Sequence, residues 1–288
     1  MIEDKICLIT GGTSGIGKEI AIGLAKMKAN VVVVGRDKVR CEATVQEIHK
    51  NASITTNKNR VSYLLADLSS QKSVKQLAKK FLDNYESLDI LINNAGVFLS
   101  KRLTTVDGIE YTFAVNHLAP FLLTNLLLER MKSSSPSRII TTSSVAHKGA
   151  RINFDNLQFE GGRYNGLQAY RQSKLANILF TLELARRTKE SGVISNCFHP
   201  GGVRTNLVHS SPWYYRLIWV FISPFLVSPK KGADTGVYLA SSPKVDGITG
   251  KYFVKRKSID LSGPANDPNA ATRLWNISEE LTGYNRKR

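Results

Sequence analysis

The chain has 288 residues, of which 42% are hydrophobic and 22% are charged, so it can bury a full core. This excludes collagen-like, low-complexity and disordered proteins. Its 40 Lys and Arg residues outnumber 23 Asp and Glu residues, which gives a formal net charge of +17. This excess of basic residues is spread along the chain, so we expect a solvated basic surface. Nucleic-acid binders usually concentrate their positive charge on one face, so we expect no nucleic-acid partner.

The cysteines and the N-terminal residues indicate the compartment. Cys7, Cys41 and Cys197 are widely separated and have no Cys-x-x-Cys spacing. This excludes a disulfide framework and a Cys-based zinc site, and favours a reducing compartment. The first residues lead directly into an apolar run, so we expect no signal peptide or N-terminal anchor. We therefore predict a cytoplasmic protein and leave peripheral membrane contact open.

Short apolar runs alternate along the chain with segments whose apolar residues recur every three or four positions. The expected strands are 5–10, 31–35, 60–65, 88–93, 137–143 and 193–198, and the expected helices are 16–28, 70–84, 107–131 and 170–190. Apolar strands separated by helices are typical of a parallel sheet covered on both faces. We predict an α/β fold over 1–288: one Rossmann-type domain with a doubly wound parallel sheet and helices on both faces.

The first expected strand runs into a glycine-rich turn, Thr10-Gly-Gly-Thr-Ser-Gly-Ile-Gly17, and a helix follows. Such glycines let the backbone turn tightly and approach a pyrophosphate, while the helix presents its positive N-terminus. The spacing differs from the commoner Gly-x-Gly-x-x-Gly, but the strand–turn–helix context supports a dinucleotide site. The alternative, an ordinary βα turn, would not require three glycines. The predicted contacts are Gly11, Thr13, Ser14, Gly15, Ile16 and Gly17.

The second expected strand ends at Arg36, where NAD-preferring sites usually place an acid that holds the ribose 2′-hydroxyl. A guanidinium instead suits a 2′-phosphate, which it can bind bidentately. An acid, Asp37, follows one position later, and an exposed Arg at a helix start is the alternative interpretation. Together with the glycine-rich turn, Arg36 favours NADP over NAD.

A tyrosine and a lysine, Tyr170 and Lys174, lie at i and i+4 of an expected helix, and therefore on one face. A neighbouring ammonium lowers the pKa of a phenol, ordinarily about 10, by stabilising its anion. The phenol can then exchange a proton with a carbonyl or alcohol oxygen. The pair also occurs by chance on many helices. Asn116 lies in a long expected helix and Ser143-Ser144 ends an expected strand, and we expect both segments to come close to this pair.

These motifs occur in an order that resembles the short-chain dehydrogenase/reductase family over about residues 5–254. The matching motifs are Thr10-Gly-x-x-x-Gly-x-Gly17, Asn93-Asn-Ala-Gly96, Asn116, Ser144, Tyr170-x-x-x-Lys174 and Pro200-Gly201. The strings 168–177, 250–253 and 272–276 look like the retinol dehydrogenase branch.

The resemblance implies a role for each catalytic residue. Ser144 would donate a hydrogen bond to the substrate oxygen, with Ser143 as the alternative serine. Tyr170 would be the acid/base, and Lys174 would bind the nicotinamide ribose and lower the pKa of Tyr170. Asn116 would hold a relay water through its main-chain carbonyl. The cofactor contacts that the resemblance implies are Asp67 at the adenine, Leu68, Asn94, Ala95, Gly96, Pro200, Gly201, Val203 and Thr205, with Thr205 at the carboxamide.

One departure from the branch follows Asn116, where Ala119-Pro120 replaces the usual Gly-His. Proline has no N–H and clashes with the carbonyl four residues earlier, which is that of Asn116. We hypothesise that Pro120 frees this carbonyl for the relay water and fixes a kink. A helix broken one turn early is the alternative.

Two segments are candidates for the substrate side. The segment 150–167 either lines the substrate cleft or is a surface loop. Within 200–230 we expect an apolar lid, because 213–227 holds six aromatic residues and is too short to span a membrane. Contact with a membrane surface, a buried core helix and a dimer helix are alternatives for 213–227. Residues 255–288 form a C-terminal extension.

The leading prediction is an NADP-dependent oxidoreductase that transfers hydride between the nicotinamide and a small hydrophobic carbonyl or alcohol, retinal-like or another lipophilic aldehyde or ketone. An acyl-chain ketoreductase is one alternative. A non-catalytic NADP(H)-sensing regulator is another, although the complete set of Ser144, Tyr170 and Lys174 argues against it. A homo-oligomer and a monomer on a membrane both stay open.

Overall fold

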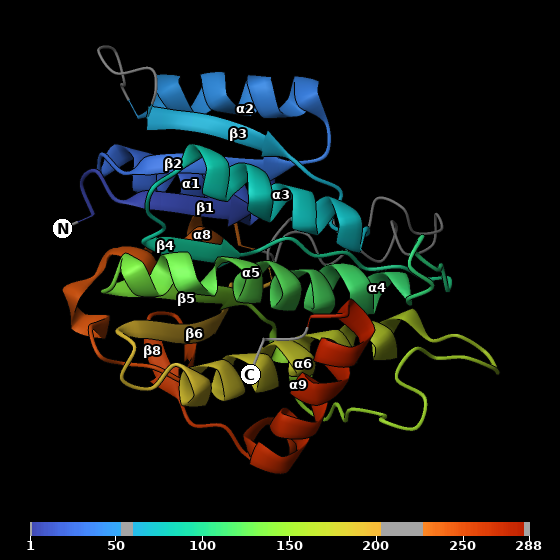
Figure 1. Cartoon of the computed structure of the whole chain (residues 1–288). Helices are drawn as coiled ribbons and strands as arrows, with labels where there is room; N and C mark the ends of the chain where they lie inside the picture. Colours follow the sequence, from blue (N-terminus) through green and yellow to red (C-terminus); the bar gives the residue numbers. More distant parts are fainter. Residues whose placement is uncertain (1, 53–59, 203–226, 285–288) are drawn as a thin grey trace.

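The computed structural model describes residues 2–52, 60–202 and 227–284. Within these ranges eight strands form one sheet, in the order β3-β2-β1-β4-β5-β6-β7-β8 (Figure 1). Neighbouring strands are parallel except for the antiparallel pair β7 and β8. The strands are β1 (Ile6–Thr10), β2 (Asn30–Gly35), β3 (Val61–Leu65), β4 (Ile90–Asn93), β5 (Ser137–Thr142), β6 (Val193–His199), β7 (Lys251–Val254) and β8 (Lys257–Ile259).

Helices cover both faces of the sheet (Figure 1). The helices α1 (Gly15–Lys26), α2 (Lys38–Asn51) and α8 (Pro229–Ser241) lie on one face, and α3 (Gln71–Asn84), α5 (Ala119–Ser133) and α6 (Gly166–Arg187) lie on the other. The C-terminal helix α9 (Pro268–Thr282) packs on α6. The short elements are α4 (Tyr111–Phe113), the π-helical turn η2 (Ala114–Leu118) and the 3-10 turns η3 (Val145–His147), η6 (Pro243–Val245) and η7 (Gly263–Asn266).

Alternate residues of the central strands enter opposite cores. Ile9 and Val33 join the cluster under α1 and α8, whereas Leu8 and Val32 join the cluster under α3 and α5. Because side chains alternate along a strand, a sheet buried on both faces needs apolar residues at every position. The predicted fold class, a doubly wound parallel sheet with helices on both faces, is confirmed.

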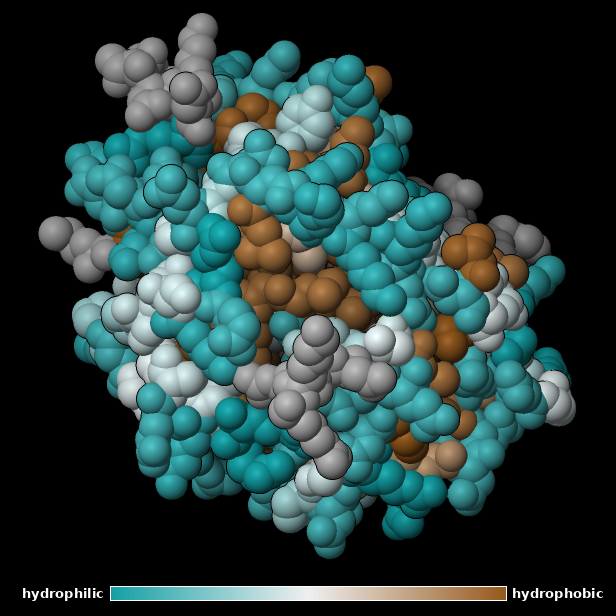
Figure 2. Space-filling model, in the orientation of Figure 1, coloured by the Kyte–Doolittle hydropathy of each residue, from teal (hydrophilic) through white to brown (hydrophobic). Residues whose placement is uncertain are grey.

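The outer surface of the α3–α5–α6 face is mostly hydrophilic, and apolar side chains gather in the hollow between α3 and α5 (Figure 2). One helical stretch among the described residues, Tyr111–Ser133, is long and apolar enough to cross a membrane. Its most apolar window is 89% buried inside the protein, as in the core helix of a globular protein.

The helix expected over 107–131 differs from the structure. It is divided into α4, the π-helical turn η2 and α5. The helix expected from Tyr170 begins earlier, at Gly166, where Asn165 caps it by accepting from the Gln168 N–H. The helices α2, α8 and α9 and the strands β7 and β8 were not among the expected elements. In α2 only Cys41, Thr44 and Ile48 are buried, which leaves little apolar periodicity to detect.

Candidate active site

Most candidate residues lie at the carboxyl edge of the sheet, where β1, β2, β4, β5 and β6 end. Doubly wound sheets bind ligands at this edge.

The glycine-rich turn after β1 is closely packed and leaves the start of α1 open. A Cβ on Gly17 would lie 2.4 Å from both Asn94 Nδ2 and the Gly11 carbonyl oxygen, so only glycine fits. Gly11 and Gly15 have φ angles of +63° and +54°, which glycine adopts readily. Ser14 precedes α1 but makes no side-chain cap.

By contrast, Asp37 caps α2, Ser70 caps α3 and Asn165 caps α6, and side chains also cap α4, α8 and α9. The first-turn N–H groups of α1 thus have no side-chain acceptor from Ser14, and the first turn contains no acidic residue. This arrangement fits an anionic group such as a pyrophosphate.

The Asn93–Gly96 loop joins this turn to the candidate catalytic residues. The Asn94 side chain donates to the Thr10 carbonyl at 3.1 Å, and the Ala95 N–H donates to Thr10 Oγ1 at 3.2 Å. At the far end of the loop, a Cβ on Gly96 would lie 3.4 Å from both Asn116 Oδ1 and Lys174 Nζ. The Asn93–Gly96 loop therefore connects the glycine-rich turn to the candidate catalytic residues.

The end of β2 presents Arg36, which is exposed, as is Arg40 one turn into α2. The Asp37 carboxylate is already engaged, because it accepts the Arg40 N–H at 2.8 Å as the cap of α2. A cation and not a free acid is thus presented beside the end of β2.

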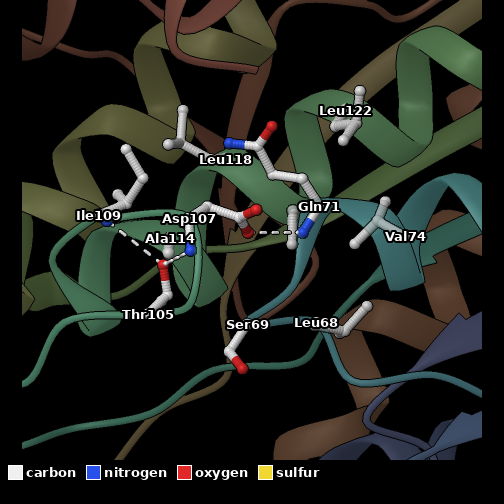
Figure 3. Close-up of a pocket in the computed structure, with 11 residues that line it drawn as sticks. Leu68, Ser69, Gln71, Val74, Thr105, Asp107, Ile109, Ala114, Leu118 and Leu122 are labelled. Atoms are coloured by element: carbon white, nitrogen blue, oxygen red, sulfur yellow. Dashed lines mark hydrogen bonds between the residues drawn. The ribbon is translucent and has the colours of Figure 1, made fainter. Parts of the chain in front are cut away.

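After β3, Asp67 is exposed and its Oδ1 accepts from the N–H and the hydroxyl of Ser69, at 2.9 and 2.7 Å. Next to it, Leu68 lines a cavity of about 10 Å³ between the starts of α3 and α5, where the Gln71 N–H donates to Asp107 (Figure 3). The space holds about one water molecule. It is too small for a nucleotide base.

The two serines after β5 have different contacts. Ser143 is buried and its hydroxyl donates to the Lys174 carbonyl at 2.7 Å. The Ser144 hydroxyl accepts from the Ala146 N–H at 3.1 Å, and its side chain acts on Tyr170 to lower the pKa of the phenol against the effect of burial. Ser144 therefore lies at the Tyr170 phenol, whereas the Ser143 hydroxyl connects the end of β5 to α6 by a hydrogen bond.

Tyr170 and Lys174 face each other on α6. Lys174 is 3% exposed, and its Nζ lies 5.5 Å from the centroid of the Tyr170 ring and 3.3 Å from the Thr142 carbonyl oxygen, to which it donates. Burial lowers the pKa of Lys174 to about 8. Burial also raises the pKa of Tyr170 to about 12, against the hydrogen bond from Ser144.

The expectation that Lys174 lowers the pKa of Tyr170 below its ordinary value is thus corrected. The cost of removing the phenolate from water outweighs the neighbouring interactions. Tyr170 is consequently a protonated phenol at neutral pH.

The side chain of Asn116 is fully buried within the π-helical turn η2. Its Nδ2 donates to the Val97 carbonyl and to Ser173 Oγ, both at 3.0 Å, and its Oδ1 accepts the Val97 N–H at 2.7 Å. Since Pro120 has no N–H, the Asn116 carbonyl lacks its ordinary helical donor. The helix carries a π turn at this point, a feature at which helices kink and which is frequent at functional sites.

The candidates after β6 are described only in part. Pro200 and Gly201 follow β6, Gly201 has a φ of +91°, and the Gly202 carbonyl accepts from the Val227 N–H at 2.8 Å. Val203, Thr205 and the apolar segment 213–227, except Val227, lie outside the described residues, as does most of the expected lid 200–230.

Parts of the segment 150–167 pack against the protein, whereas residues 160–163 are exposed. Leu157 is buried, and the Arg273 guanidinium of α9 lies 4.3 Å from the centroid of the Phe154 ring. The Tyr164 hydroxyl donates at 2.9 Å to Glu110, a buried carboxylate.

Several residues that shape the site were not singled out in the sequence. The edge of the Phe98 ring contacts Tyr170 at a centroid distance of 5.8 Å, and Ser173 and the Thr142 carbonyl bind Asn116 and Lys174. Phe98 follows the Asn93–Gly96 motif by two positions, which is a signal that could have drawn attention to it. The role of a main-chain carbonyl such as that of Thr142 leaves no trace in the sequence.

Comparison with known proteins gives consistent matches. The sequence matches the family described as short chain dehydrogenase over residues 5–213. Human retinol dehydrogenase 13 is 41% identical over 287 residues, which cover 98% of this chain and 86% of that protein. The crystal structure of a putative uncharacterized protein from Mycobacterium paratuberculosis has a TM-score of 0.78 and 33% identity, and the match covers 98% and 94% of the two chains. A blue fluorescent protein from a metagenomic library, in complex with NADPH, has a TM-score of 0.67 and 27% identity, covering 87% and 96%.

Proposed function

Because the chain belongs to the short chain dehydrogenase family, in its retinol dehydrogenase branch, and is an oxidoreductase acting on CH–OH groups, we propose that it reduces a hydrophobic aldehyde or ketone with NADPH. The reverse reaction oxidises the corresponding alcohol. The relatives named retinol dehydrogenase support a retinal-like substrate.

The residues at the carboxyl edge of the sheet suit NADP. The open start of α1 would hold the pyrophosphate, and Arg36 would pair with the 2′-phosphate, since Asp37 is engaged as a helix cap. The similar structure in complex with NADPH supports the same choice. When bound, the nicotinamide supplies or accepts the hydride.

The observation that carries the proposal is the convergence of Ser144 and Lys174 on Tyr170. The protonated phenol donates its proton to the carbonyl oxygen of the substrate, and the Ser144 hydroxyl holds the same oxygen. Negative charge then develops on Tyr170, where the buried Lys174 ammonium stabilises it. Because Tyr170 begins in its acid form, the site is protonated for carbonyl reduction.

A substrate panel tests this function. The purified protein is incubated with NADPH or NADH and with retinals, aliphatic aldehydes, ketosteroids or quinones, and cofactor oxidation is followed. We expect NADPH-dependent reduction of at least one lipophilic carbonyl, retinal first. NADPH binding without reduction of any carbonyl would instead support a nucleotide sensor.

A further inference from the structure

One buried polar side chain beside the site has no part in the chemistry described above. His117 follows Asn116 in the turn η2 and is 1% exposed. The rings of Phe113, Phe121 and Phe180 surround it, at centroid distances of 5.1, 6.4 and 6.2 Å. Burial lowers the pKa of His117 to about 3, so the imidazole is neutral at physiological pH. A neutral ring has one donor and one acceptor nitrogen, and leaving either unused inside a protein is unfavourable.

His117 reaches the C-terminal helix through one of its nitrogens. Its Nε2 lies 2.9 Å from Ser278 Oγ on α9. The Ser278 hydroxyl donates to the Leu274 carbonyl at 2.8 Å, so toward His117 it is the acceptor, and the ring proton lies on Nε2.

The other nitrogen, Nδ1, lies on the side of Asn177 of α6, but neither Nδ1 nor Asn177 Oδ1 has a hydrogen-bond partner among the described residues. Ser278 is therefore the side chain that holds the imidazole by a hydrogen bond.

The residue before His117 connects the same turn to the helix of the catalytic lysine. Asn116 Nδ2 donates to Ser173 Oγ on α6 at 3.0 Å, and Ser173 directly precedes Lys174. The turn η2 is thus hydrogen-bonded to α9 through His117 and to α6 through Asn116.

We propose that His117 is a positioning residue that couples the C-terminal helix α9 to the active site. Held by Ser278 through Nε2 and enclosed by three phenylalanine rings, the imidazole fixes the turn that carries Asn116. Helix α9 lies beyond residues 5–213, the part matched by the family, so the proposal makes a segment outside that match part of the catalytic scaffold.

The test compares two buried hydroxyls on α9. Ser278→Ala removes the partner of His117, whereas Thr282→Ala removes a hydroxyl that bonds only carbonyls of its own helix, Ser278 and Glu279. We expect Ser278→Ala to lower kcat for carbonyl reduction by about 3- to 30-fold with the KM for NADPH unchanged, and Thr282→Ala to retain the wild-type kcat.

Substitutions of His117 itself provide a rescue experiment. His117→Phe keeps the ring volume without polar atoms and should lose kcat as Ser278→Ala does. His117→Gln keeps a donor and an acceptor and should recover part of that loss. Equal loss of kcat in Ser278→Ala and Thr282→Ala, or wild-type kcat in His117→Phe, would overturn the proposal.

A second measurement does not require turnover, because kcat rests on the proposed function. Amide hydrogen exchange across 113–121 should be faster in Ser278→Ala than in Thr282→Ala and the wild type. If the wild type reduces no carbonyl, the proposed function is wrong, and the hydrogen-exchange rates alone test the coupling between α9 and the turn η2. Equal exchange rates across 113–121 in all three proteins would contradict this coupling.

Discussion

Lys174 Nζ lies 5.5 Å from the centroid of the Tyr170 ring, and burial moves the two pKa values apart, down to about 8 for Lys174 and up to about 12 for Tyr170. At neutral pH, Lys174 is therefore an ammonium and the neighbouring Tyr170 is a protonated phenol. This is the state needed to protonate a carbonyl oxygen and then stabilise the resulting phenolate.

The first prediction concerns pH. The ammonium form of Lys174 exists below its pKa, so the rate of carbonyl reduction should hold at neutral pH and fall as pH rises through about 8. Lys174→Arg keeps the charge without titrating in this range. The kcat of Lys174→Arg, measured against pH, should show no decline near pH 8. If kcat declines at the same pH in the wild type and in Lys174→Arg, the decline belongs to the titration of another group.

The second prediction concerns the cofactor. Arg36→Gln removes the exposed cation at the end of β2 and should raise the KM for NADPH by about 10- to 100-fold, because hydrogen bonds to charged groups are the stronger kind. The KM for NADH should stay unchanged. Lys79→Gln, which removes an exposed charge on α3, is the control. An equal rise in the KM for NADPH and the KM for NADH would mean that Arg36 does not contact the 2′-phosphate.

The third prediction separates the two serines. Ser144→Ala should lower kcat and leave thermal stability nearly unchanged, since Ser144 reaches Tyr170. Ser143→Ala should lower stability by about 1 kcal/mol, because its buried hydrogen bond to the Lys174 carbonyl is lost. Steady-state kinetics and thermal unfolding of both variants provide the comparison. The assignment of Ser144 fails if Ser143→Ala alone abolishes turnover in a folded protein.

The fourth prediction concerns Pro120. Pro120→Ala restores an N–H four residues after Asn116. If the Asn116 carbonyl holds the relay water, this new donor should compete for it and lower kcat by about 2- to 10-fold without loss of stability. An unchanged kcat in Pro120→Ala would remove the relay from the account.

The sequence was sufficient to predict β1 to β6 and the convergence of the motif residues, because fully apolar strands and glycine-rich turns have strong local signals. The protonation of Tyr170 was not predictable, since desolvation depends on residues that arrive from other elements. The π turn at Asn116 and the contact between His117 and Ser278, 161 positions apart, are also products of tertiary packing. The weakly apolar helix α2 has too few buried residues to show a period.

The central claim is that Tyr170 donates the proton in NADPH-dependent carbonyl reduction, and Tyr170→Phe tests it most directly. The variant removes one hydroxyl and keeps the ring beside Phe98. Turnover and NADPH affinity should be measured on the same preparation, with retinal or the best carbonyl substrate found. We predict that kcat falls by about 10²- to 10⁴-fold while the Kd for NADPH stays within about twofold of the wild type. A variant that binds NADPH and retains wild-type turnover would contradict the account.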